Sequence, residues 1–120
     1  MYGRFENLRV WQLAREFRKE IYALSQKLPK AEQYNLVSQI QRASVSVTAN
    51  IAEGHGRYHF QSQILCLRLA RGSLNEVLDH LYTALDQKYI SQQIFDDLYK
   101  KGRSLEKSIN AYIGHLQRKK

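Results

Sequence analysis

Apolar side chains return every three or four residues through four long stretches of the chain, and this spacing predicts four amphipathic helices. The predicted helices cover about residues 7–28, 31–53, 59–87 and 91–116. The side chains predicted to be buried are Val10, Ala14, Phe17, Ile21, Leu24, Leu28, Leu36, Ile40, Ala43, Val47, Ile51, Phe60, Ile64, Leu67, Ala70, Leu74, Val77, Leu81, Leu85, Ile94, Leu98, Leu105, Ile109, Tyr112 and Leu116.

One stretch of the second predicted helix resembles a strand. Residues 43–49 read Ala-Ser-Val-Ser-Val-Thr-Ala, and β-branched side chains favour strands. The three-and-four spacing continues on both sides of this stretch, so we predict that it is helical.

The predicted helix ends rest on proline, glycine and capping residues. Asn7 is predicted to cap the first helix, and Pro29 to end it. Glu32 is well placed for the positive start of the second helix. The glycines at 54 and 56 are predicted to end that helix through the left-handed conformation that glycine readily adopts. Residues 117–120 are predicted to fray.

Four long helices with short connections predict an all-α fold, an antiparallel up-down-up-down four-helix bundle that forms one domain over residues 1–120. No apolar run approaches the ~18 residues of a membrane span, and the N-terminus has no hydrophobic signal core. The single cysteine, Cys66, lies in an apolar stretch and is predicted to be a buried thiol. We therefore expect a cytoplasmic protein.

The positive charge of the chain is concentrated at its two ends. The formal net charge is +8. Residues 1–30 carry seven Lys or Arg against three acids, residues 31–87 four against five, and residues 88–120 eight against three. Charge distributed in this way attracts polyanions, of which nucleic acid is the commonest. The alternative is a solvated face that keeps the protein soluble.

The sequence contains almost no pattern typical of a catalytic or metal-binding site. His55 and His59 have the spacing of a helical ligand pair, but they straddle a glycine loop, so we favour two loop histidines. No phosphate-binding loop and no nucleophile–base pair stands in the sequence. We therefore expect no metal, no cofactor and no enzymatic activity.

A polar stripe runs beside the apolar one on the second predicted helix, and the third helix carries a similar stripe. Such a stripe is either a wet outer face or a subunit interface. Small residues beside it allow a close approach, and its short amide and hydroxyl side chains also favour the interface. Gly72, within the third predicted helix, suggests a close helix contact, with plain tolerance of the glycine as the alternative. The residues predicted to form this interface are Gln39, Arg42, Ser46, Asn50, Glu53, Arg57, Arg68, Arg71 and Glu76.

Eight tyrosines are many for a chain of 120 residues. Tyr22, Tyr34, Tyr58 and most of the others are predicted to pack at the ends of the bundle and around the rim of its core. The alternative for some of them is stacking on the bases of a single-stranded nucleic acid.

Several motifs together resemble the four helix bundle protein family. They are FENLRVW at residues 5–11, LPKAEQYNL at 28–36, QIQRA at 39–43, ANIAEG at 49–54 and LARGSLNE at 69–76. This family includes proteins encoded by intervening sequences in large-subunit ribosomal RNA genes, and it is similar to the accessory variability proteins of diversity-generating retroelements. The resemblance implies a ring-like homopentamer without established enzyme activity. For the retroelement members it also implies binding to nucleic acid and to a reverse transcriptase.

We expect a non-enzymatic, basic, nucleic-acid-binding accessory protein, acting with a reverse transcriptase and binding RNA or DNA through its phosphates. The alternative is a structural homo-oligomeric scaffold that binds proteins without nucleic acid. The residues predicted to bind nucleic acid are Arg15, Arg18, Lys19, Lys100, Lys101, Arg103, Lys107, Arg118, Lys119 and Lys120.

Overall fold

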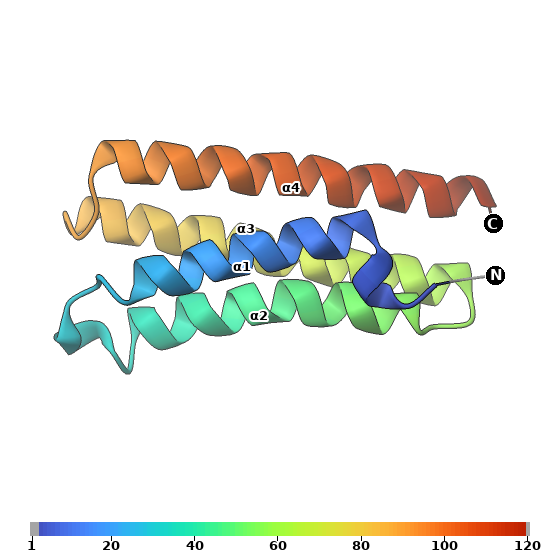
Figure 1. Ribbon diagram of the computed structural model, residues 1–120, viewed down its shortest axis with the longest axis horizontal. Coiled ribbons are helices and arrows are strands. Elements are labelled where there is room, and N and C mark those ends of the chain that lie inside the picture. Colours follow the sequence, from blue (N-terminus) through green and yellow to red (C-terminus); the bar gives the residue numbers. More distant parts are fainter. Residues whose placement is uncertain (1–2, 120) are drawn as a thin grey trace.

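The structure, a computed structural model, describes residues 3–119. It contains four helices: α1 (Arg9–Ser25), α2 (Leu36–His55), α3 (Phe60–Asp86) and α4 (Gln92–Lys119). The helices lie side by side along the long axis of the molecule, and their connections alternate between its two ends (Figure 1). Residues 3–119 contain no strand, so the prediction of an all-α protein with four helices is confirmed.

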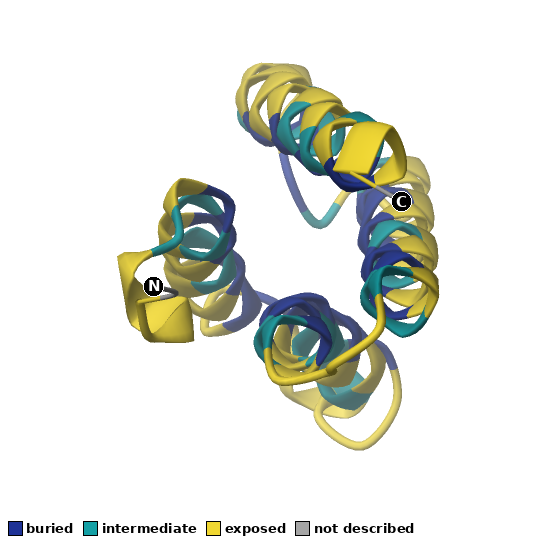
Figure 2. Ribbon diagram, turned by 90° about the vertical axis from the view of Figure 1, so that its right-hand side faces the viewer, coloured by how far each residue is buried: buried dark blue, intermediate teal, exposed yellow. Residues whose placement is uncertain are grey.

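The core lies between the four helices, where the buried side of each helix faces inward (Figure 2). Its centre holds Ile21, Ile40, Leu74 and Ile109, each 0% exposed. The apolar seams predicted from the spacing form this core, although Phe60, Leu85, Ile94 and Tyr112 lie at its margin and are only partly buried. Residues 43–49 are helical throughout, as predicted.

The first helix begins two residues later than predicted, and the capping role predicted for Asn7 is wrong. Asn7 closes a short 3-10 turn, Phe5–Asn7, and Leu8 stands at the cap position without a side-chain hydrogen bond. The helix ends at Ser25, and the next bonds are tighter: the amide of Lys27 donates to the carbonyl oxygen of Leu24 at 2.9 Å. The chain therefore leaves the α-helix before Pro29 is reached.

The second helix begins at Leu36 rather than near residue 31, because Lys30–Glu32 form a 3-10 turn. Glu32 still serves the helix start, as its charge predicted. Its carboxylate accepts hydrogen bonds from the Leu36 amide at 3.4 Å and from the Tyr89 hydroxyl at 2.8 Å. The Tyr89 bond is the largest cause that lowers the pKa of Glu32, and Glu32 in turn raises the pKa of Tyr89. This contact ties the start of α2 to the α3–α4 connection.

Two glycines allow the helices to pack closely, and neither is the one that the sequence suggested. A Cβ on Gly54 would lie 2.9 Å from the Cβ of Cys66, and one on Gly102 would lie 2.5 Å from Cδ2 of Leu78. Gly72, expected at a close contact, has nothing within 4 Å of its Cβ position and faces solvent. Within this chain, the close approaches are therefore of α2 to α3 and of α4 to α3.

The ends of α2 and α4 also differ from expectation. α2 includes Gly54 and ends at His55, two residues beyond the predicted end, and the capping Gly56 has a right-handed backbone with a φ of −81°, so the left-handed explanation is wrong. Among residues 3–119, only Lys88 has a positive φ, 63°. α4 continues through Lys119, so residues 117–119 are helical rather than frayed, and Lys120 lies outside the described residues. None of the described helices combines the length and the apolar character that crossing a bilayer requires.

Candidate nucleic-acid interface

Three cations form a straight line along the outer face of α4. Lys100, Lys107 and Arg118 are separated by 7 and 11 residues, which places them on one side of an α-helix. All three are exposed, and they lie opposite the buried Leu105 and Ile109. At 1.5 Å per residue the line is about 27 Å long. We call Lys100, Lys107 and Arg118 the outer stripe.

The cations of the outer stripe are unpaired within the described residues, although Asp96 stands one turn before Lys100 and Glu106 is next to Lys107. Lys100, Lys107 and Arg118 make no ion pair or side-chain hydrogen bond with residues 3–119. Lys119 follows at the end of the same helix and is also exposed. Their charged groups are therefore hydrated and available to an anionic partner.

Two of the predicted binding lysines are paired with carboxylates instead. Lys101 on α4 bonds to Glu20 on α1, and Lys19 lies 3.7 Å from Glu16 on its own helix. The Glu20 bond is the largest cause that raises the pKa of Lys101. These lysines still add positive charge, but their partners offset much of it.

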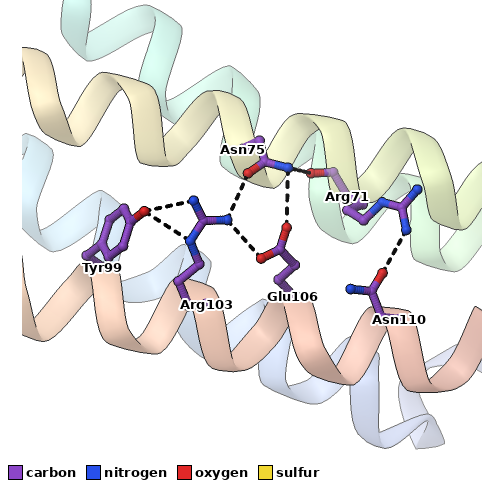
Figure 3. A network of polar contacts seen from close by, with 6 residues as sticks. All are labelled: Arg71, Asn75, Tyr99, Arg103, Glu106 and Asn110. Atoms are coloured by element: carbon purple, nitrogen blue, oxygen red, sulfur yellow. Dashed lines mark hydrogen bonds and ion pairs between the residues drawn. The ribbon is translucent and has the colours of Figure 1, made fainter.

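Arg103 belongs to a polar network between α3 and α4 (Figure 3). Its Nε and Nη2 donate to the Tyr99 hydroxyl at 3.1 and 2.7 Å, and its Nη1 donates to Glu106 at 2.8 Å and to Asn75 at 3.2 Å. The guanidinium also lies 5.0 Å from the centre of the Tyr99 ring. The Tyr99 bond, followed by the Glu106 bond, raises the pKa of Arg103. All three guanidinium nitrogens are occupied, so a phosphate would have to displace bonds that hold the two helices together.

The two arginines predicted on α1 lie apart from the outer stripe. Arg18 donates to the Thr48 hydroxyl of α2 at 2.9 Å, and Arg15 lies 5.8 Å from the Trp11 ring. α1 stands between α2 and α4 (Figure 2), and the bond to Thr48 places the Arg18 guanidinium at α2. The predicted cations therefore fall into three settings: the outer stripe with Lys119, the paired Lys19, Lys101 and Arg103, and the α1 arginines. Lys120 lies outside the described residues.

Comparison with known protein families matches residues 6–111 to the 23S rRNA-intervening sequence protein family. The chain belongs to this family. It is also similar to a crystal structure of a protein with unknown function from the S23 ribosomal protein family of Bacteroides thetaiotaomicron, with a TM-score of 0.80 and 23% identity over 87% of this chain and 97% of that one. At that identity the likeness shows a shared fold. Comparison with curated proteins finds no matching relative.

In this member of the 23S rRNA-intervening sequence family, the polar stripe predicted as an interface is partly occupied within the chain. Ser46 accepts a hydrogen bond from Asn50 at 3.0 Å and one from Ser73 of α3 at 2.8 Å. Arg71 donates to Asn110 of α4 at 2.7 Å. Gln39 donates to Asn35, Arg57 to Glu53, and Glu76 lies 3.2 Å from the His80 ring. The exposed residues without such a partner among residues 3–119 are Arg42 and Arg68.

Two apolar residues of the same face were missed in the sequence. Leu65 and Leu69 lie one turn apart on α3 and are 57% and 53% exposed. Gly72 follows on the same side with open space around it. These leucines do not follow the spacing of the buried residues of α3. Their apolar character at outward positions of the helix is the signal that the sequence contains.

The tyrosines divide into packed and exposed ones. Tyr82 and Tyr99 form an aromatic cluster with Phe95, with ring centres 4.7 to 5.6 Å apart. Tyr34 and Tyr58 are each 91% exposed, so the prediction that they pack on the bundle is wrong. Their position in connections, where no neighbouring helix covers them, explains the difference.

The two histidines with ligand spacing have other neighbours. The His55 ring lies 2.5 Å from the carbonyl oxygen of Gly3, and the His59 ring packs edge-on against Tyr58. Over residues 3–119 no three His, Cys, Asp or Glu side chains gather where they could hold a metal ion.

Proposed function

We propose that this protein is a non-enzymatic RNA-binding protein that contacts phosphates through the outer stripe of α4. The observation that carries the proposal is the line of Lys100, Lys107 and Arg118, exposed and without a carboxylate partner over about 27 Å. RNA is the favoured polyanion because the family to which the chain belongs is named for sequences within 23S rRNA.

The physical basis is the release of condensed counterions. A nucleic acid that meets hydrated cations exchanges its bound salt ions for them, so affinity falls as the salt concentration rises. Contacts to phosphates carry no sequence information, so binding should tolerate changes of sequence. A rigid helix holds the three charges in line, which reduces the ordering cost of binding.

The test is fluorescence anisotropy with a labelled structured RNA at several salt concentrations. Replacing Lys100, Lys107 and Arg118 together by alanine should reduce the slope of log affinity against log salt by about 2. The matched control replaces Arg9, Lys27 and Lys88 by alanine, which removes the same charge from other exposed positions that have no ion pair among residues 3–119. Equal loss in both triple variants would show that only net charge matters and would remove the outer stripe from the proposal.

The second part of the proposal is assembly into a homo-oligomer, with the ring-like pentamer as the expected form, through the outer faces of α2 and α3. The exposed Leu65 and Leu69, the open space at Gly72 and the cation of Arg68 support an interface there. Burying the exposed half of these two leucines gains about 1.5–3 kcal/mol for each subunit pair.

Light scattering coupled to size-exclusion chromatography tests the assembly. Leu65→Asp with Leu69→Asp should reduce the mass to that of one chain, and Asn50→Leu should weaken assembly. Arg71→Glu is less specific, because it also breaks the bond to Asn110. A native protein that elutes as a monomer would contradict this part of the proposal. If it assembles but binds no RNA or DNA in a gel-shift assay, the protein is the structural scaffold instead.

The finer role implied by the family resemblance stays a prediction. In that role the protein is a cytoplasmic accessory protein that acts with the reverse transcriptase of a diversity-generating retroelement. Co-purification of the tagged protein with a candidate reverse transcriptase, before and after nuclease treatment, tests it. A complex that persists after the treatment supports a protein–protein contact.

A further inference from the structure

A groove of about 800 Å³ lies where α1 ends and α2 begins. It is bounded by the last turn of α1, the connection through Pro29 and Tyr34, and the first half of α2. This end of the bundle is opposite the end that carries Arg118 (Figure 1). The groove plays no part in the contacts of the outer stripe.

The charge of this groove is positive without exception. Lys30 and Arg42 are the charged side chains among the residues that line it, and no Asp or Glu is among them. Two other hollows of the described chain contain acids: one has Glu32 and Asp79, and one has Glu20 and Asp97 together with Lys27 and Lys101. An anionic ligand is therefore favoured in this groove over the other two.

Two aromatic rings line the groove, one almost fully exposed and one partly exposed. Tyr34 is 91% exposed and Tyr22 is 38% exposed. Within residues 3–119 neither ring packs against another aromatic side chain, whereas Tyr82 and Tyr99 pack around Phe95 and Tyr112 stacks on His115. A flat apolar ring in water beside cations has the composition of sites on which unpaired bases stack.

Amide side chains supply the hydrogen-bonding groups that a base edge requires. Gln26 and Gln33 line the groove. Gln41 also lines it, and its amide nitrogen donates to the Ser25 hydroxyl at 2.8 Å, which fixes the side chain and leaves its carbonyl oxygen as an acceptor. The groove thus offers rings, amides and cations together, the three groups that match base faces, base edges and phosphates.

We propose that this groove binds an unpaired segment of RNA, with bases stacked on Tyr34 and Tyr22 and phosphates against Lys30 and Arg42. The proposal rests on the proposed function and deepens it, since it gives single-stranded RNA a site distinct from the outer stripe. Arg18 lies one turn before Tyr22 on α1 and extends the positive path out of the groove.

The experiment compares an unstructured, fluorescein-labelled RNA of about 10 nucleotides with the duplex of the same sequence. Tyr34→Ala should weaken binding of the single strand about fivefold or more. The duplex should bind as before, since its bases are stacked internally. Tyr34→Phe should restore the single-strand affinity, because the ring is what stacks. The control is Tyr58→Ala, which removes an equally exposed tyrosine at the other end of the bundle.

A spectroscopic signature comes from the same oligonucleotide carrying 2-aminopurine. Stacking changes the fluorescence of this base, and the change should persist in Tyr34→Phe and be lost in Tyr34→Ala with Tyr22→Ala. Because Tyr34 is almost fully exposed, Tyr34→Ala and Tyr34→Phe should unfold at the same temperature as the native protein.

Three results would overturn the proposal that the groove binds single-stranded RNA. The first is equal weakening of single-strand binding by Tyr58→Ala and Tyr34→Ala. The second is a change in oligomer mass in Tyr34→Ala, since it would assign the groove to a subunit contact. The third is unchanged single-strand binding in Tyr34→Ala with Tyr22→Ala. If the outer-stripe variant still weakens RNA binding in that case, the groove fails alone and the proposed function stands. If the native protein binds no RNA at all, both fail.

Discussion

Two cations one helical turn apart on α4, Arg103 and Lys107, are in opposite circumstances. Arg103 is bonded to Tyr99 and Glu106 of its own helix and to Asn75 of α3. Lys107 has no partner among the described residues. The two cations count equally in a net charge. Their surroundings give one the task of joining helices and leave the other for a ligand.

The comparison shows that the bonds around a cation, rather than its place in a charged segment, decide its availability. A guanidinium that already uses its three nitrogens in four hydrogen bonds to fixed acceptors has little left for a phosphate. An ammonium in water keeps its hydration and its counterions, and its binding to a polyanion releases ions. Substitutions of Arg103 and of Lys107 should therefore change different measured quantities.

The largest expected effect comes from the close packing of α4 against α3 and α1, which positions both cations. Gly102 lies beside Arg103, and a side chain there would meet Leu78 of α3 and Phe17 of α1. Gly102→Val should lower the free energy of unfolding by about 2–3 kcal/mol, because the core around it is closed. Urea denaturation followed by circular dichroism measures the loss.

Gly114→Val on the same helix is the control for this variant. Its Cβ position meets only the flexible end of Arg118, at 3.4 Å. The stability should change by less than about 0.5 kcal/mol, since valine has slightly better helix propensity than glycine. Equal losses at the two glycines would mean that α4 does not depend on the close approach at Gly102.

The second prediction compares substitutions of Arg103 and Lys107 directly. Arg103→Met keeps the aliphatic stem and removes the bonds to Tyr99 and Glu106, so it should cost about 1 kcal/mol of stability. Lys107→Met should leave stability unchanged and should reduce the salt slope of RNA binding by about 0.7–0.9. Thermal unfolding and anisotropy on both variants give the full comparison. A loss of stability in Lys107→Met would contradict the difference between the two cations. So would a larger loss of RNA affinity in Arg103→Met than in Lys107→Met.

The smallest effect concerns the bond between Glu32 and Tyr89, which is exposed. Since this bond lowers the pKa of Glu32, its contribution is present above the ordinary value of 4.5 and is lost as the pH falls through the lowered pKa. Since the bond raises the pKa of Tyr89, the contribution is also present below 10 and is lost as the pH rises through that raised pKa.

Tyr89→Phe removes the hydroxyl that makes this bond. It should therefore lower the unfolding temperature at pH 7, by less than Arg103→Met does, and the difference should shrink as the pH falls below 4.5. A difference that is as large at pH 3 as at pH 7 would mean that the charge of Glu32 is not involved.

The sequence predicted the four helices and the core because three-and-four spacing is set by the geometry of one helix. Ile21 and Ile40 follow that spacing and are fully buried. Helix ends were harder, because they depend on turns that compete locally: the 3-10 turn at Lys30–Glu32 delays α2 until Leu36. Spacing also cannot distinguish a glycine at a close contact from one in open space, which is why Gly72 was mistaken for the kind of site that Gly102 is.

The candidate site could be predicted only in part. Clustering of Lys and Arg near the C-terminus correctly located α4 as basic, and the three-dimensional bonds then divided its cations. The network of Arg103 joins residues 28 positions apart, a pairing that no local pattern contains. The groove at Tyr34 depends on how a connection folds over the start of α2, so its composition became visible only with the helices in place.

Cys66 gives this protein a built-in reporter of its own motions. It is the single thiol of the chain, it is 4% exposed, and it lies against Gly54 where α3 meets α2. An alkylating reagent can reach its sulfur only when these two helices separate, so the rate of labelling under native conditions measures how often they open. Protection of this thiol by RNA or by assembly could then be followed by mass spectrometry without introducing any probe.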